Sequence, residues 1–353
     1  MPAATEDLKG RPIRFAVIGC GRIAGKHFEA IAAHAGNAEL VGVCDVDGAS
    51  RKAASDKTGA PAFETMDKLI SEASPDIVVL ATPSGLHPQQ TIRAAQAGCH
   101  VMTEKPMATR WADGRRMVDA CDEAGVRLFV VKQNRRNATL QLLKRAVAGG
   151  RFGRIYSVAI NVFWTRPQDY YDSADWRGTW EFDGGALMNQ ASHYIDLLDW
   201  LIGPIESIQA QTATLARNIQ VEDTGAMLVR WRSGAIGTVN VSMLTYPENL
   251  EGSITILGEK GTVRVGGVAV NEIQHWKFAE EDPMDREVEE ASYATTSVYG
   301  FGHPLYYENV IQVLRGEAVA DTDGREGLKS LEVLIATYLS ARDGQRISLP
   351  LEY

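Results

Sequence analysis

The sequence predicts an α/β protein with a Rossmann-type doubly wound parallel sheet at its N-terminus and a C-terminal α+β domain with a large, mostly antiparallel open sheet. Three observations support this fold class. Short apolar runs alternate with amphipathic helical patterns in the first third of the chain, a glycine-rich turn follows the first run, and β-rich segments crowd together after Arg154. Because 353 residues are many for one core, we expect two domains, at residues 11–133 and 134–353.

In the first domain, the strands are predicted from short runs that are apolar throughout. Strands of this kind are buried on both faces, and the helical patterns between them imply crossover connections, so the sheet should be parallel. The predicted strands are Ile13 to Ile18, Glu39 to Cys44, Asp76 to Ala81, His100 to Met102 and Val126 to Val131.

In the second domain, β-rich segments follow one another with few helical patterns between them. Ser233-Gly234 is a compact turn signal of the kind that joins antiparallel strands. The predicted strands are Ile155 to Trp164, Ser207 to Leu215, Gly225 to Arg232, Ala235 to Leu244, Gly252 to Leu257 and Thr262 to Val265.

Charge and composition exclude several functions. The formal net charge of -9, with no Lys/Arg-rich run, argues against a nucleic-acid partner, although a few gathered arginines can still bind a small anion. The four cysteines have no CxxC spacing, so we expect buried thiols and no metal site. Without a signal-like start or an apolar stretch of spanning length, we expect no membrane insertion and a cytoplasmic location.

A dinucleotide-binding fingerprint follows the first predicted strand directly. The segment Gly19-Cys20-Gly21-Arg22-Ile23-Ala24 has the GxGxxA pattern and leads into a predicted helix. The first glycine permits the tight turn, the second lets the pyrophosphate approach the backbone, and the alanine lets the helix pack closely on the sheet. We therefore expect cofactor contacts from Gly19, Gly21, Arg22, Ile23 and Ala24.

An acidic residue at the end of the second predicted strand favours NAD over NADP. Asp45 lies where a carboxylate accepts hydrogen bonds from the adenosine ribose and repels a 2′-phosphate. Asp47 can share this role. Two later strands end in Thr82-Pro83-Ser84-Gly85-Leu86-His87 and in Thr103-Glu104-Lys105-Pro106, at the edge of the sheet where doubly wound folds bind ligands. We expect Thr82, Pro83, His87 and Glu104 to contact the cofactor, although the first segment is equally compatible with a structural turn.

Taken in order, the GxGxxA turn, the acidic strand end, TPxxxH and EKP resemble the glucose-fructose oxidoreductase/inositol dehydrogenase family, over nearly the whole chain. The resemblance implies a cis bond before Pro106 and a catalytic Lys105 that faces both the nicotinamide and the reacting carbon of the substrate. A cation there stabilises the alkoxide that develops as hydride leaves, and it can also relay a proton.

A second polar group lies in the segment Asp183 to Asp196, which we predict to be a helix that begins after Gly184-Gly185. Helical spacing puts Asn189, His193 and Asp196 on one flank. We assign His193 as the general base, because imidazole suits proton removal at neutral pH. Many relatives have an aspartate four residues before this histidine, where this chain has Asn189. Base strength can therefore come from His193 alone, from Asp196 or through Lys105.

Four further segments resemble one subgroup of that family: Trp176 to Phe182, Ala186 to Trp200, Thr245 to Pro247 and Ser297 to Tyr307. This subgroup oxidises the C3 hydroxyl of a UDP-linked N-acetylated hexuronic acid with NAD, in the synthesis of bacterial lipopolysaccharide O-antigen sugars. The resemblance implies that reaction for this chain. Oxidation of inositol or a free sugar, or a non-catalytic NAD-sensing regulator, are the alternatives.

The remaining candidate residues concern the substrate. Arg166 and Arg177 precede the Gly-Gly segment and either pair with the anionic groups of a nucleotide-sugar or are ordinary surface arginines. Gln133 should border the nicotinamide. We expect substrate contacts also from Asn134, Arg135, Tyr299 and His303. Relatives usually pair their open sheets, so we expect a homodimer or homotetramer; whether NADH is released or recycled in place by a 2-oxo acid stays open.

Overall fold

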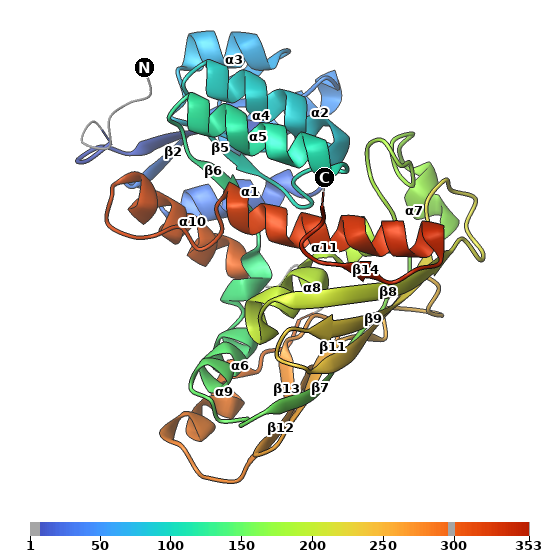
Figure 1. The fold of residues 1–353 in the computed structure, drawn as a ribbon. Coiled ribbons are helices and arrows are strands. Elements are labelled where there is room, and N and C mark those ends of the chain that lie inside the picture. Colours follow the sequence, from blue (N-terminus) through green and yellow to red (C-terminus); the bar gives the residue numbers. More distant parts are fainter. Residues whose placement is uncertain (1–7, 296–300, 353) are drawn as a thin grey trace. The chain divides into compact units, whose positions relative to one another are not determined.

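The chain forms two compact units in a computed structural model that describes residues 8–295 and 301–352 (Figure 1). Within those ranges, unit 1 comprises the chain up to Gln133 together with His303–Leu331, and unit 2 comprises Asn134–Gly302 and Glu332–Tyr353. The predicted boundary after residue 133 agrees with this division. The prediction of one continuous second domain was wrong, because residues 303–331 return to unit 1.

Unit 1 is built on a six-stranded sheet in the order β3-β2-β1-β4-β5-β6, in which every pair is parallel. This order reverses between β1 and β4, so the loops that follow these two strands meet at the edge where doubly wound sheets bind ligands. The strands are β1 Ile13–Ile18, β2 Ala38–Cys44, β3 Ala62–Phe63, β4 Ile77–Leu80, β5 His100–Thr103 and β6 Leu128–Val130.

Residues 303–331 belong to unit 1 because their helices bury apolar side chains in its core. Tyr306, Tyr307, Val310 and Ile311 of α10 are buried in the same core as Phe15 of β1, which explains why this late helix belongs to the first unit. The helices of unit 1 are α1 Ala24–Ala33, α2 Gly48–Thr58, α3 Met66–Ala73, α4 His87–Gln96, α5 Trp111–Glu123 and α10 Gly302–Leu314; helix α11, Gly324–Asp343, runs across the boundary at residue 331.

Unit 2 contains an eight-stranded sheet in the order β13-β12-β11-β7-β10-β9-β8-β14. All its pairs are antiparallel except β7 with β10, which confirms the predicted, mostly antiparallel sheet. The strands are β7 Ile155–Phe163, β8 Ile205–Ala213, β9 Thr224–Trp231, β10 Ile236–Ser242, β11 Glu251–Gly258, β12 Gly261–Gly266, β13 Glu272–Phe278 and β14 Ile347–Ser348.

One face of this sheet carries helices, and α6 and α8 both lie on that side (Figure 1). Buried and exposed residues alternate strictly along β9, as expected for a sheet with one packed face. Sequence reasoning missed β13 because this edge strand is half exposed and rich in polar residues. The remaining helices of unit 2 are α6 Ala138–Ala148, α7 Gln168–Asp172, α8 Ser192–Leu197 and α9 Val288–Ala291. In the part of the chain that is described, no helix is both long and apolar enough to cross a membrane.

Candidate active site

The loop after β1 has the shape that the dinucleotide fingerprint predicts. Gly19 has a φ of +92°, and a Cβ there would lie 2.7 Å from the carbonyl carbon of Ala81, so only glycine fits. Its N–H donates to the carbonyl oxygen of Cys44 at 2.7 Å, which joins the turn to the end of β2. A Cβ at Gly21 would meet none of the described atoms within 4 Å, so a ligand can approach the backbone there. These residues fit a bound dinucleotide.

The other fingerprint residues carry the chain into α1. Ala24 is fully buried, as close packing of helix on sheet requires, whereas Arg22 is exposed. Ile23 occupies the N-cap position and supplies no side-chain hydrogen bond to the first turn. A phosphate is a suitable acceptor for amide groups at such a helix start.

The two acidic residues after β2 have different partners. Asp45 accepts the Cys20 N–H on Oδ2 at 2.6 Å and the Asp47 N–H on Oδ1 at 2.8 Å, so its carboxylate lies against the dinucleotide turn. The carboxylate of Asp47 instead caps α2 by accepting the backbone N–H of Ser50 at 2.8 Å. This division favours Asp45 over Asp47 as the ribose partner.

The loop after β4 is braced from inside the protein. Thr82 donates its hydroxyl to Gln90 at 2.6 Å, and Pro83 leads into a short 3-10 turn. His87, predicted to contact the cofactor, is fully buried, with Nε2 2.9 Å from the carbonyl oxygen of Thr82 and Nδ1 3.1 Å from that of Pro106. Burial lowers the pKa of His87, and the two carbonyls oppose that change. Its side chain therefore joins two strand-end loops rather than presenting an edge to a ligand.

The EKP segment follows β5, and its Lys105–Pro106 bond is cis, as the family resemblance implies. Glu104 is buried and accepts the backbone N–H of Lys105 on Oε2 at 3.2 Å. Burial alone would raise the pKa of Glu104, but the imidazoles of His27 and His303 outweigh it and hold that pKa well below its ordinary value. His303, predicted for the sugar site, is 2% exposed and lies in unit 1 with Nε2 3.7 Å from Glu104 Oε1. His303 therefore lies beside the Glu104 carboxylate.

The chain passes from unit 1 to unit 2 after Gln133, the residue that we predicted to border the nicotinamide. Gln133 is buried at the end of unit 1, and the preceding Lys132 donates to the Ser330 hydroxyl at 2.7 Å within the same unit. Asn134 opens unit 2 in the 3-10 turn Gln133–Arg136, and its buried Oδ1 has no hydrogen-bond partner among the described residues. Sequence reasoning did not single out the buried Lys132.

The segment from Ala186 is not the single regular helix that we predicted. It begins as a π-helical turn, Ala186–Gln190, in which the Ala191 N–H donates to the carbonyl of Ala186 at 2.9 Å. Helix α8, Ser192–Leu197, follows, and a second π turn occupies Leu198–Ile202. The extra residue in a π turn changes the helical phase, so the simple four-residue spacing of Asn189 and His193 does not hold.

Asn189 has an acidic partner that sequence spacing did not reveal. Its side-chain amide donates to Asp183 Oδ1, and Asp183 Oδ2 accepts the Gly178 N–H at 2.7 Å. Asp183 is buried, as is His193 on α8. The aspartate that many relatives carry at position 189 thus has a neighbouring counterpart six residues earlier.

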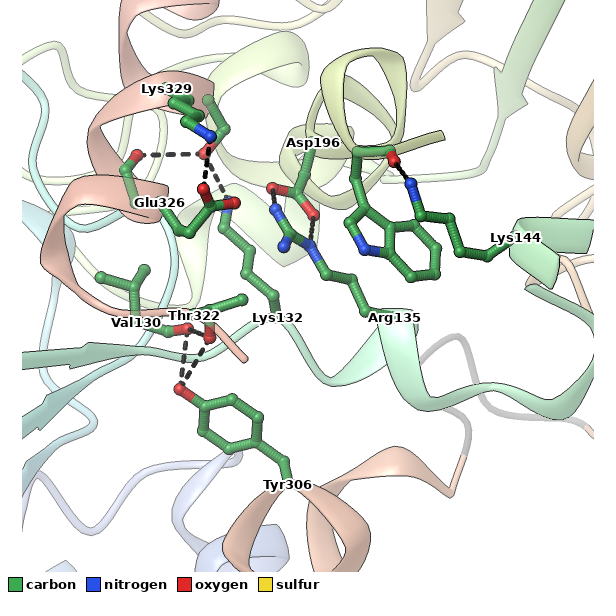
Figure 2. Close-up of polar contacts among 12 residues, drawn as sticks. Val130, Lys132, Arg135, Lys144, Asp196, Tyr306, Thr322, Glu326 and Lys329 are labelled. Carbon is green, nitrogen blue, oxygen red and sulfur yellow. Dashed lines mark hydrogen bonds and ion pairs between the residues drawn. The ribbon is translucent and has the colours of Figure 1, made fainter. Parts of the chain in front are cut away.

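Asp196 and Arg135 form a buried ion pair within unit 2. Arg135 donates through Nε and a terminal nitrogen to the two carboxylate oxygens, at 2.7 and 2.8 Å, and Figure 2 shows the two groups facing one another. Nearby, Lys144 donates to the carbonyl oxygen of Trp200, and the Arg135 guanidinium lies 5.5 Å from the Trp200 ring. Asp196 was predicted to be catalytic and Arg135 to bind substrate, and the structure brings the two together.

Arg166 and Arg177 gather around one tyrosine. Arg177 donates to the Tyr170 hydroxyl at 2.6 Å and stacks 4.4 Å from the centre of that ring. Arg166 donates Nε to Gln190 at 2.9 Å, and Gln190 donates to the same hydroxyl at 3.1 Å. Both arginines are half-buried and stacked on aromatic rings, so they are not ordinary surface residues. Since Gln190 belongs to the π turn, this cationic cluster adjoins the Asn189 segment.

One predicted site residue is not among the described residues, and sequence reasoning missed two others. Tyr299, predicted to line the sugar site, falls outside the described residues. Glu222 was missed because Glu222-Asp223 looks like a solvated polar pair, yet it is buried against the start of the π turn. His27 was missed because a single histidine in a helix carries no motif signal. Among residues 8–295 and 301–352, no group of three His, Cys, Asp or Glu side chains is arranged to hold a metal ion.

Together, the dinucleotide turn, the acidic end of β2 and the lysine after β5 define an oxidoreductase with an NAD-binding Rossmann domain. The chain belongs to the oxidoreductase family whose NAD-binding Rossmann fold matches residues 13–132 and whose C-terminal alpha/beta domain matches residues 144–349. This confirms the predicted resemblance to glucose-fructose oxidoreductase and inositol dehydrogenase.

Solved structures similar to this chain include two WlbA dehydrogenases in complex with NADH and UDP-GlcNAcA. The one from Chromobacterium violaceum is 68% identical, with 98% of each chain covered and a TM-score of 0.94. The one from Bordetella pertussis is 67% identical, covers 97% of this chain and 99% of its own, and has a TM-score of 0.95. A curated relative, the D-apiose dehydrogenase of Paraburkholderia graminis, is 29% identical over 95% of this chain and 89% of its own.

Proposed function

We propose that this protein oxidises the C3 hydroxyl of UDP-N-acetylglucosaminuronate to the 3-keto sugar, with NAD as hydride acceptor. The observation that carries the proposal is the 68% identity over 98% of the chain to a dehydrogenase solved with NADH and UDP-GlcNAcA. The D-apiose and inositol dehydrogenases at 28–29% identity support only the broader activity, oxidation of a sugar or polyol hydroxyl.

The residues of unit 1 supply the cofactor half of this proposal. Gly19, Gly21 and the start of α1 would hold the pyrophosphate, and Asp45 would accept the ribose hydroxyls. Bound NAD supplies the acceptor for the hydride. Thr82, Pro83 and Gln133 would border it, whereas His87 would act only by bracing the loops on either side.

The proposed reaction needs a base and a cation at one carbon. The C3–H bond breaks with its electron pair passing to NAD, while the hydroxyl proton leaves to a side chain, so the products are a ketone, NADH and a proton on the protein. We assign proton removal to His193 and stabilisation of the developing alkoxide to Lys105. Proton relay through Lys105 is the alternative. The amide of Asn189, held by Asp183, would orient the sugar or the base, and Asp196 would act through its pairing with Arg135.

The anionic groups of the substrate require cationic side chains in fixed positions to bind them. Arg166 and Arg177 are stacked on Trp164, Tyr170 and Trp176, which fixes their guanidinium planes while leaving each half-buried. Such preset arginines suit the hexuronate carboxylate or the diphosphate. Asn134, whose buried oxygen lacks a hydrogen-bond partner among the described residues, is a further candidate sugar contact.

The proposal is tested by incubating the purified protein with NAD and each candidate substrate while following the absorbance of reduced nicotinamide. We expect turnover of UDP-N-acetylglucosaminuronate and little turnover of UDP-N-acetylglucosamine, which has a hydroxymethyl group in place of the carboxylate. Reduction of the product with borodeuteride should place deuterium at C3. Turnover confined to inositol or free aldoses would contradict the proposal.

We also propose that the exposed face of the unit 2 sheet joins copies of this chain into a dimer or tetramer. Leu228 and Ile236, on the adjacent strands β9 and β10, are each 58% exposed, and Leu257 on β11 is 43% exposed on the same face, with β7 between β10 and β11. Exposed apolar residues grouped in this way are typical of association surfaces. Light scattering on the protein and on an Ile236→Lys variant tests this, and a monomeric parent protein would refute it.

Because NAD and nucleotide-sugars occur in the cytoplasm, we propose that location for the enzyme.

A further inference from the structure

The backbone on both sides of Lys105 is fixed by buried side chains. The Lys105 N–H donates to Glu104 Oε2 at 3.2 Å, and the carbonyl of Pro106 lies 3.1 Å from Nδ1 of His87. Glu104 can link Lys105 to other helices, because one of its carboxylate oxygens accepts the Lys105 N–H while the other faces different side chains.

The second oxygen of Glu104 faces two imidazoles from other helices. Oε1 lies 3.1 Å from Nε2 of His27 on α1 and 3.7 Å from Nε2 of His303 on α10. His27 is fully enclosed, and the two histidine rings meet edge to face at 5.6 Å between centroids. The His27 contact lacks hydrogen-bond geometry and the His303 contact is too long for a hydrogen bond, and Oε1 and both nitrogens of His303 have no hydrogen-bond partner among the described residues. A buried carboxylate in this position depends on its two imidazole neighbours.

Tyr307 and Glu104 face the two ring nitrogens of His27. The Tyr307 hydroxyl lies 2.8 Å from Nδ1, and burial raises the Tyr307 pKa well above its ordinary value, so the hydroxyl keeps its proton. Because Nε2 faces a carboxylate oxygen of Glu104 at 3.1 Å, a neutral ring carries its N–H on Nε2 and leaves Nδ1 to accept from this hydroxyl. His27 therefore lies between Tyr307 and Glu104, the side chain that accepts the backbone N–H of Lys105.

We propose that His27 and His303 are positioning residues that act through Glu104 to hold Lys105. The inference rests on the proposed dehydrogenase reaction for its kinetic consequences. A lysine that stabilises an alkoxide must be placed accurately, because a shift of about 1 Å in a catalytic group can cost about 10²-fold in rate. The titratable groups around Glu104 are His27 on α1, His303 and Tyr307 on α10, His87 on α4, and Lys105 itself, and Lys26 on α1 acts on His303.

The test compares Glu104→Gln, His303→Leu and His303→Gln with a matched control, His34→Gln. His34 also joins α1 to the α10 region, through the carbonyl of Pro304 at 2.8 Å, but it lies two turns along α1 from His27. Each variant is measured as the full chain for three properties: kcat and KM for UDP-N-acetylglucosaminuronate across pH, the Kd for NADH, and hydrogen exchange of the peptide containing Lys105.

We expect Glu104→Gln and His303→Leu to lose roughly 10-fold or more in kcat, with KM and the Kd for NADH changed by less than about 3-fold. Their Lys105 peptide should exchange faster, while peptides of α1 stay protected. His303→Gln keeps a polar N–H group beside Glu104 and should recover part of kcat, and His34→Gln should behave as wild type.

Unchanged exchange at Lys105 in both Glu104→Gln and His303→Leu would overturn the inference. So would a parallel loss of kcat, NADH affinity and α1 protection, since that pattern reports general destabilisation. If the wild-type protein does not oxidise the nucleotide-sugar, the proposed function fails, while the exchange measurements still decide whether His303 positions Lys105.

Discussion

Arg135 holds both carboxylate oxygens of Asp196, at 2.7 and 2.8 Å, with each side chain less than one-tenth exposed. The pair connects the turn at the entrance to unit 2 with α8, the helix that carries His193. The arginine is therefore one of the groups that fix this helix.

Removal of one partner from this pair should destabilise unit 2 strongly. Asp196→Asn leaves a buried guanidinium without its counterion, a change that typically costs about 3–5 kcal/mol. Thermal unfolding should show a fall in Tm of roughly 6 °C or more. The control is Asp122→Asn, which breaks an exposed pair with Arg325 and should leave Tm nearly unchanged, because solvent screens the interaction. Equal shifts for the two variants would contradict the prediction.

Glu222 should make stability depend on pH. Its carboxyl accepts the Leu187 N–H and the Tyr338 hydroxyl at 2.9 and 2.8 Å, but burial dominates and raises its pKa from 4.5 to about 7. The folded state therefore holds a proton that the unfolded state releases above pH 4.5. The stability contribution is full below about pH 4.5 and is lost as pH rises toward 7, by about 3 kcal/mol in total.

The measurement is the midpoint of denaturant unfolding between pH 4.5 and 8 for wild type and Glu222→Gln. Because glutamine keeps an acceptor oxygen without titrating, the variant should lose most of the decline that wild type shows across this range. Gly185 gives a second test of the same contact, since a Cβ there would lie 1.8 Å from Glu222 Oε2 and Gly185→Ala must disturb the π turn. An identical pH dependence in wild type and Glu222→Gln would remove Glu222 as the cause.

Asp45 should determine the preference for NAD. Asp45→Ala removes the carboxylate that would repel a 2′-phosphate, so the ratio of kcat/KM for NADP to that for NAD should rise by roughly 10-fold or more. Asp47→Asn is the matched control, because Asp47 caps α2 and asparagine caps a helix about equally well, so the cofactor ratio should stay unchanged. A shift in the ratio from the Asp47 variant alone would reverse the assignment.

How far the sequence predicts this protein depends on the range of the interactions involved. The strand Ile13–Ile18 and the turn at Gly19 were predicted correctly, because apolar runs and glycine conformations are local properties. The return of α10 to the first unit was not predicted, since Tyr306 and Tyr307 show an apolar face but not the core that receives it. Contacts such as that of His303 with Glu104 join residues about 200 positions apart, and sequence spacing predicts no contact over such a separation.

The π turn illustrates a different limit. Asn189 and His193 have helical spacing in the sequence, yet the bond from Ala191 to Ala186 inserts one residue into the turn. A π turn is rare enough that regular geometry is the better sequence prediction, and such turns often occur at functional sites. The partner of Asn189 therefore became clear only when the structure placed Asp183 beside it.

Lys105 and His193 should each be essential for the proposed reaction, with different signatures. Lys105→Met removes the cation that would stabilise the alkoxide, and His193→Asn removes the proposed base while keeping a polar side chain. Each should lower kcat by about 10²-fold or more with little change in the Kd for NADH. Because the two groups would act on one carbon, the double variant should lose much less than the product of the single losses.

The pH dependence of kcat then identifies the base. If His193 takes the proton, kcat in wild type falls as pH drops and its imidazole becomes protonated, and this acid limb disappears in His193→Asn but persists in Lys105→Met. Proton removal by Lys105 would give the opposite pattern, because the limb would vanish with the lysine. Intact turnover in both variants would contradict both assignments, whereas an absence of turnover in the wild-type protein would support the non-catalytic, NAD-sensing alternative.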